Sequence, residues 1–293
     1  MTLRHWNGGS VIAHRQRLMA MVIAILSVGV AGPIQAEAIV AKADTSRAAK
    51  EAAIQDIPFA SLTPEAQQKI QAVVSKPSMF RRMPVNVIDC DPELYRFLIR
   101  NPEVVVNIWQ LMGITKVSTV RTGPYTLDAS DGMGTDSKVE LVFGNNDTHL
   151  IYCDGMYEGP LFRKPLQGKC VLLLKSGYVQ REDGRWHITS RLDVFVEVEN
   201  VAVDVLAKTL HPLLGKSADT NFQESIKFLE RISRTAEAND DGMDHLAGRL
   251  DVQPDIKSQF SQITQKVFDQ GQERLARQTV PVDATVPTVV QQR

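Results

Sequence analysis

The clearest pattern of hydrophobic and polar positions runs along residues 184–200. Its even positions are apolar apart from Ser190, and its odd positions from 187 onward are largely polar apart from Phe195. Because side chains alternate across a β-strand, this pattern predicts one long strand with an apolar face and a polar face. On the polar face, Arg191 and Asp193 are expected to form a surface ion pair.

Shorter strand patterns, separated by turn residues, fill the region between residue 114 and this long strand. Residues 144–147 read Gly-Asn-Asn-Asp, which predicts a hairpin turn because Gly and Asn tolerate positive φ. Most of the connections have hairpin length, so the sheet should be antiparallel. The predicted fold class is therefore α+β, with a curved antiparallel sheet of about six to seven strands.

Helical patterns precede and follow the strands. Asp91 before Pro92 is typical of a helix start, with a capping side chain ahead of proline at the first position. Near the other end, an apolar stretch at 201–214 is followed by Thr220 and Gln223, which form a capping box for a C-terminal helix. The apolar stripe of that C-terminal helix consists of Phe222, Ile226, Leu229 and Ile232.

The beginning of the chain has the layout of a secretory signal peptide. A basic stretch is followed by an uncharged apolar run at 18–32, a helix-breaking Pro33, and an A-x-A site at Ala36 to Ala38. We expect cleavage near Ala36 or Ala38 and a mature protein that is periplasmic or extracellular. A single membrane anchor is the alternative, but the run falls short of the ~20 residues needed to span a bilayer.

These signals divide the chain into four parts. Residues 1–38 are the expected signal peptide, and 39–77 a helical or flexible spacer. Residues 78–239 form the expected globular domain. Residues 240–293 are expected to contain a linker, an amphipathic helix and a disordered tail. The apolar stripe of that helix, at 256–267, would offer a surface for a protein partner.

Charge and cysteine content narrow the choice of function. The formal net charge is -1, which gives no electrostatic footprint for nucleic acid. Cys90, Cys153 and Cys170 match no zinc spacing. They are interpreted as buried apolar residues, and a disulfide between Cys153 and Cys170 stays open. No histidine pair, phosphate loop or nucleophile elbow is visible, so neither a metal nor a cofactor is expected.

The order of elements resembles that of the START-like, or SRPBCC, helix-grip superfamily. The resemblance covers about residues 80–239 and rests on strand, two short helices, an antiparallel meander and a C-terminal helix, without a sequence motif. It implies a curved sheet gripping the C-terminal helix around a cavity, as in lipid-transfer proteins, ligand carriers and polyketide cyclases. The break at Gly215 and the segments outside this range depart from the family. Another α+β domain with helices on one face of the sheet is the alternative.

The resemblance implies that inward side chains of the strands and helices surround an apolar ligand. Each candidate is open to a second interpretation, in which it fills a solid core. Ser190 draws attention as the one polar residue on an apolar strand face, where it would bond either a ligand or the protein itself. The candidates are Trp109, Met112, Phe143, Tyr152, Leu172, Trp186, Ser190, Leu192, Phe222, Ile226 and Leu229.

Three functions remain open on the sequence alone. The leading hypothesis is an exported, non-catalytic protein that binds or carries an apolar small molecule or a lipid. The second is a cell-envelope interaction module whose core is filled. The third is an enzyme of the cyclase or aromatase type, which would need an acid or base in the cavity. Its candidates are Ser190, His149, Tyr152 and Glu140.

Overall fold

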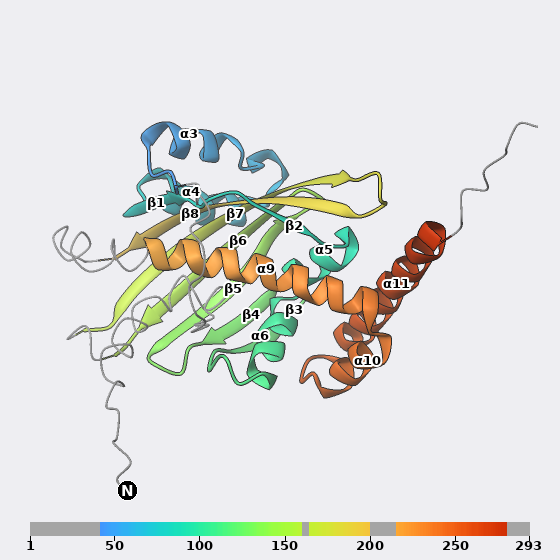
Figure 1. Cartoon of the computed structure of the whole chain (residues 1–293). Coiled ribbons are helices and arrows are strands. Elements are labelled where there is room, and N and C mark those ends of the chain that lie inside the picture. Colours follow the sequence, from blue (N-terminus) through green and yellow to red (C-terminus); the bar gives the residue numbers. More distant parts are fainter. Residues whose placement is uncertain (1–41, 160–163, 200–214, 280–293) are drawn as a thin grey trace, which may run out of the picture.

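One antiparallel sheet organises the part of the chain that the computed structural model describes, which is residues 42–159, 164–199 and 215–279 (Figure 1). It has eight strands in the order β1-β8-β7-β6-β5-β4-β3, and β2 pairs with β8 beyond the end of β1. This confirms the α+β class and the antiparallel sheet. The strands are β1 (Met79–Arg82), β2 (Asn86–Asp89), β3 (Ser118–Gly123), β4 (Thr126–Ser130), β5 (Thr135–Gly144), β6 (Thr148–Tyr157), β7 (Leu166–Gln180) and β8 (Trp186–Val198).

Helices pack on both faces of this sheet (Figure 1). One face, here called the α4 face, carries the helices that precede β1. The other, the α9 face, carries the remaining helices of the described residues. They are α3 (Arg47–Gln55), the 3-10 turn η1 (Phe59–Ser61), α4 (Pro64–Ser75), α5 (Pro92–Arg100), α6 (Pro102–Leu111), α9 (Lys216–Ala238), α10 (Asp240–Arg249) and α11 (Pro254–Thr279).

The α4 face of the long strand β8 is buried at Asp193 and Phe195, although its sequence predicted an exposed polar face. Phe195 packs against Phe80 with ring centroids 4.9 Å apart. Asp193 is 0% exposed, and Arg82 donates to both of its carboxylate oxygens at 2.6 and 3.1 Å. The expected ion pair of Arg191 with Asp193 is present at 3.4 Å, but its expected surface position is wrong for Asp193, because the N-terminal segment covers this part of the sheet.

That cover is provided by α3, η1 and α4, which fill the described part of the segment expected as a spacer. The Thr63 hydroxyl accepts from the Ala66 amide and caps α4, as the Thr-Pro-Glu sequence indicates. The buried side of α4, which includes Ile70 and Val73, packs against Phe195 and its neighbours on β7. The spacer is therefore a structural layer of the domain.

On the opposite face, α9 runs across the sheet as one long helix (Figure 1). Its predicted stripe from Phe222 to Ile232 is buried in the main core together with α5, α6 and the inner side chains of the strands. The Asp91 carboxylate caps α5 by accepting from the amides of Glu93 and Leu94. The apolar stretch 201–214 that precedes α9 lies outside the described residues.

The segment after α9 is also part of the domain. Where a linker was expected, the Asn239 side chain caps helix α10. The amphipathic stripe of α11 faces inward, and Phe260 stacks on Phe97 of α5 with centroids 6.0 Å apart. The stripe offered as a partner surface is thus occupied within the chain. The leader and the C-terminal tail lie outside the described residues, and none of the described helices has the length and apolarity to cross a bilayer.

Candidate functional site

A cavity of about 80 Å³ lies between the α9 face of the sheet and α9 itself. Four side chains on neighbouring turns of α9 form its roof, and inward side chains of β6, β7 and β8 form its floor. Helices α5 and α6 close it from the side. The lining consists of Leu98, Ile99, Pro102, Val105, Trp109, Ile151, Leu172, Leu174, Leu192, Phe222, Ser225, Ile226 and Leu229.

Two buried polar atoms of these lining residues have no hydrogen-bond partner among the residues that the structure describes. They are Nε1 of Trp109, whose residue is 2% exposed, and Oγ of Ser225, whose residue is 8% exposed. A buried polar group without a partner costs roughly 1–3 kcal/mol, so such groups are few in native proteins. An indole N–H only donates, whereas a serine hydroxyl both donates and accepts. The pair is therefore suited to a ligand atom that accepts hydrogen bonds.

The described lining of the cavity includes no side chain that titrates. The acid–base candidates from the sequence lie elsewhere. Glu140 accepts from Lys69 at 3.0 Å on the α4 face, where Tyr152 also lies. His149 is fully buried beside α5, where its Nε2 accepts from Arg100 at 3.2 Å. Burial, reinforced by Arg100, lowers the pKa of His149 to about 4, so this imidazole is neutral at pH 7.

Six of the eleven candidate residues meet at the cavity. They share an inward position on β7, β8, α6 or α9, and Ser225 joins them one helical turn from Phe222. Like Ser190, Ser225 is a polar residue on an otherwise apolar side of its element, and this pattern could have identified it from the sequence. The six are Trp109, Leu172, Leu192, Phe222, Ile226 and Leu229.

Three further candidates lie on the α9 side of the sheet but not at the cavity. Ser190 bonds Tyr95 Oη at 2.8 Å, so it bonds the protein itself, and burial raises the pKa of Tyr95 to about 12. Trp186 lies at the start of β8 in a small recess beside α11. Met112, which is 58% exposed, lies in a groove outside the cavity.

The last two candidates, Phe143 and Tyr152, pack on the α4 face and not near the cavity. A β-bulge between Leu141 and Phe143 shifts the register of β5, so Phe143 no longer shares a face with Val139. Strand β6 is apolar on both faces, and its periodicity could not assign Tyr152 to either. All three cysteines are buried free thiols. Cys153 and Cys170 lie opposite each other in the register of β6 and β7, but they form no disulfide.

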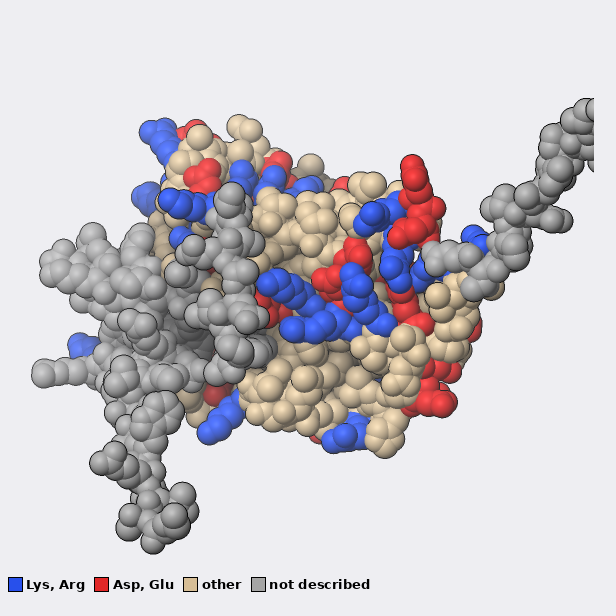
Figure 2. Space-filling view, viewed as in Figure 1, with Lys and Arg blue, Asp and Glu red and all other residues tan. Residues whose placement is uncertain are grey.

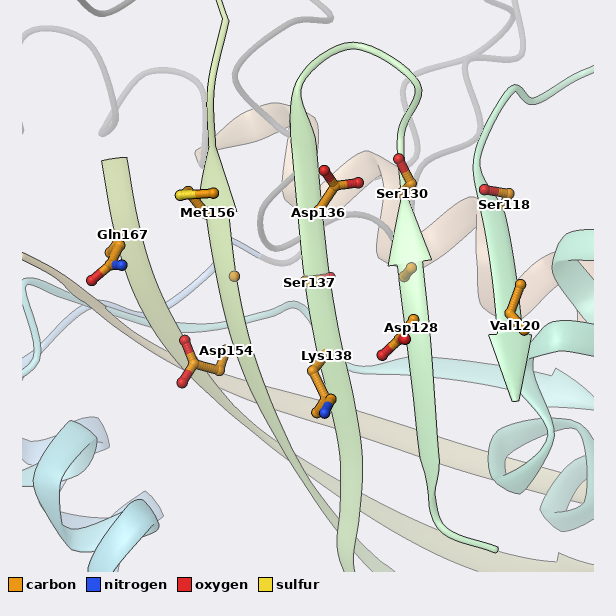
Figure 3. Close-up of a pocket in the computed structure, with 12 residues that line it drawn as sticks. Ser118, Val120, Asp128, Ser130, Asp136, Ser137, Lys138, Asp154, Met156 and Gln167 are labelled. Atoms are coloured by element: carbon orange, nitrogen blue, oxygen red, sulfur yellow. The ribbon is translucent and has the colours of Figure 1, made fainter. Parts of the chain in front are cut away.

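A second, broader hollow of about 550 Å³ lies on the α4 face of strands β3 to β7, beyond the cover of α4. Figure 3 shows that its labelled side chains are spread over neighbouring strands. The charged ones are Asp128, Asp136, Lys138 and Asp154. No group of three or more metal-ligating side chains occurs among the described residues, and the charged side chains of the hollow are mixed with the exposed apolar Val120 and Met156.

No protein family and no curated protein matches the sequence. Among solved structures, a conserved protein from Geobacillus kaustophilus aligns with 52% of this chain and 93% of its own, at 12% identity and a TM-score of 0.36. Truncated norcoclaurine synthase from Thalictrum flavum aligns with 51% of this chain and 91% of its own, at 13% identity and 0.33. The di-domain ARO/CYC protein BexL aligns with 57% of this chain and 54% of its own, at 13% identity and 0.30. The fold description rests on this chain's own arrangement, an antiparallel sheet backed by a long C-terminal helix, which fits a helix-grip fold.

Proposed function

We propose that this protein binds a small apolar molecule, with at least one hydrogen-bond acceptor, between the sheet and α9. The observation that carries the proposal is the pair of unpartnered polar atoms, Trp109 Nε1 and Ser225 Oγ, in an otherwise apolar lining. A ligand acceptor that reached either group would recover part of the free energy that its burial costs.

The size and the charge of the cavity limit the ligand. Its volume of about 80 Å³ compares with roughly 150 Å³ for an engineered cavity that binds benzene. The part of the ligand that enters is therefore smaller than benzene, such as one edge of a small ring or the end of a short chain. Because the lining carries no ionisable group, the part that enters is neutral. A carbonyl, ester or ether oxygen meets both conditions.

The same lining favours binding over catalysis. General acid–base chemistry needs a titrating group within hydrogen-bond reach of the reacting atom. Ser190, His149, Tyr152 and Glu140 all lie outside the described lining. A filled-core interaction module, the other alternative, predicts that no small molecule enters between α9 and the sheet.

A matched pair of probes tests the proposal. Cyclopentanone and cyclopentane have similar size, but only the ketone accepts a hydrogen bond. We expect cyclopentanone to bind more tightly in titrations followed by protein NMR. Ser225→Ala should reduce that preference about fivefold, since a typical hydrogen bond contributes about 1 kcal/mol. Leu172→Phe should weaken both probes by narrowing the cavity. Absence of binding by either probe, with the protein folded, would contradict the proposal.

We also propose that the protein works outside the cytoplasm, on the strength of the leader sequence at 1–38. The N-terminal residue of protein recovered from cell fractions tests this. We expect the exported protein to begin at Glu37 or Ile39. Recovery of the full-length chain from the cytoplasm alone would contradict it.

A further inference from the structure

Strand β2 forms an open edge of the sheet. Among the described strands it pairs with β8 alone. Val87 on this strand is 58% exposed, and Val85 just before it is 51% exposed. In Figure 2 the surface between the charged side chains over α9 and those nearer α3, where β2 runs in Figure 1, is largely uncharged. An edge strand with exposed apolar side chains is a site to which a further strand can add.

The backbone of β2 determines which of its groups face the open edge. The Cys90 amide donates to the Trp186 carbonyl of β8 at 3.2 Å. Because the backbone groups of successive residues alternate between the two sides of a strand, Ile88 also faces β8, whereas Val87 faces away from it. The amide and the carbonyl of Val87 are therefore directed toward any strand that lies on the outer side.

The chain just before α3 already lies along this edge of the sheet. Asp44 and Arg82 exchange both of their backbone hydrogen bonds, at 2.9 and 2.8 Å, in an antiparallel bridge on the outer side of β1. Since the bridge is antiparallel, the residues before Asp44 run in the direction in which β1 continues to β2. They read Ile-Val-Ala-Lys-Ala at 39–43, here called the 39–43 segment, of which residues 39–41 lie outside the described residues.

A bulge separates β1 from β2, and it sets the register of an outer strand. From Arg82 to Asn86 the edge strand advances by four residues while β8 advances by three, so the edge strand has one extra residue. Pro84 lies within this bulge. It has no amide hydrogen, and its carbonyl already accepts from the Asn86 side chain at 3.0 Å. Pairing on the outer side is therefore interrupted at the bulge and can resume only on β2.

We propose that the 39–43 segment adds to the open edge of β2 as a further antiparallel strand of the same chain. With the extra residue accommodated in the bulge, Val40, four residues before Asp44, lies opposite Val87, five residues after Arg82. Two β-branched apolar side chains then meet on one face of the sheet, which is a favourable cross-strand pair. The added strand shields the apolar edge from pairing with other chains.

Amide hydrogen exchange at Val87, followed by NMR, tests this proposal on the protein recovered from cells. That protein contains the 39–43 segment whether the leader is kept or is removed at either expected site. The Val87 amide should exchange roughly tenfold more slowly than in a variant that lacks the residues before Lys42, because the added strand supplies its acceptor. The Ile88 amide faces β8 and should exchange equally in both proteins. Equal exchange of Val87 in the two proteins would overturn the proposal.

Two proline variants within the segment form a matched pair. In the proposed strand the Val40 amide donates to Val87, whereas the Ala41 amide faces solvent, where proline is tolerated. Val40→Pro should therefore abolish the slow exchange of Val87, and Ala41→Pro should retain most of it. Neither position belongs to the described core, and circular dichroism confirms that each variant is folded. The same loss in both variants would overturn the proposed register.

A second copy of the chain could supply the same strand, and light scattering separates this case from the proposed one. We expect a monomer in which the exchange of Val87 stays slow on dilution, since the strand comes from the same chain. A dimer whose Val87 amide loses its slow exchange as the dimer dissociates would overturn the proposal in favour of strand exchange between copies.

Discussion

The two faces of the sheet are built from alternate residues of the same strands, yet they are packed differently. On the α4 face, Phe195 packs on Phe80. Two guanidinium nitrogens of Arg82 donate hydrogen bonds to the two carboxylate oxygens of the buried Asp193. On the α9 face, a cavity remains, and Trp109 Nε1 and Ser225 Oγ lack partners within the described part of the chain. The part of the sheet under α4 is closed by shape and charge complementarity, whereas the part under α9 keeps a cavity beside unsatisfied polar groups.

This difference distinguishes the tightly packed core under α4 from the side of the sheet on which we propose a ligand site. Unpaired polar groups and cavities both reduce stability, and they are tolerated where they serve binding. The α4 face should therefore respond strongly to any change in side-chain volume. The α9 face should accept added volume and lose ligand affinity instead.

The largest expected effect is that of Phe195→Ala on the α4 face. Removing a fully buried ring that packs on Phe80 should lower the free energy of unfolding by about 3–5 kcal/mol. Chemical denaturation followed by circular dichroism measures this loss. A cost below about 1 kcal/mol, well under the range for such a truncation, would show that the α4 face is not the tightly packed one. Cyclopentanone affinity should be unchanged in the fraction that remains folded.

The next largest effect is on the pH dependence of the free energy of unfolding, to which the neutral, buried His149 on the α9 face contributes. Its pKa is lowered from about 6.5 to about 4 by burial and by Arg100. Between these values the unfolded chain takes up a proton that the folded chain excludes. Stability should therefore fall by about 3 kcal/mol as the pH drops from 6.5 to 4.

His149→Gln provides the comparison, because a glutamine oxygen retains an acceptor for Arg100 and does not titrate. Denaturant midpoints measured at several pH values should show a shallower acid slope for this variant. Identical slopes for the two proteins would mean that His149 is already protonated in the folded state.

The adjacent residues Leu172 and Leu173 give the sharpest contrast between the faces, with a smaller effect. Leu173 lies in the closed α4 core, and Leu172 lines the cavity. Leu173→Phe should cost about 1–3 kcal/mol of stability through overpacking, whereas Leu172→Phe should cost less than about 1 kcal/mol. Thermal unfolding of both variants measures the difference. Equal losses would mean that the cavity is too small to accept a larger side chain.

Much of this arrangement could be predicted from the sequence where a single periodicity was visible. The alternation in β8, the cap at Asp91 and the stripe of α9 all appear in the structure at their expected places. These are local signals, and they depend little on the rest of the fold. From these signals, six of the residues proposed as cavity candidates were chosen correctly as lining one cavity.

The errors arose where burial depends on distant segments. The modest stripe of α4 gave no sign that this helix covers the polar side of β8, so Asp193 was expected at the surface. The bulge at Phe143 resets the alternation by one residue, and a single-residue shift moves a side chain to the opposite face. Ser225 was not predicted as a site residue, although the sequence places it between Phe222 and Ile226 on the apolar side of the helix.

The side-chain resonance of Trp109 in a ¹H–¹⁵N correlation spectrum tests the central claim most directly, with Trp109→Phe to assign the peak. Our account predicts that the free indole N–H lacks a hydrogen bond and that its peak shifts on addition of cyclopentanone, while the Trp186 peak stays in place. A Trp109 peak that does not move at saturating ligand would contradict the account.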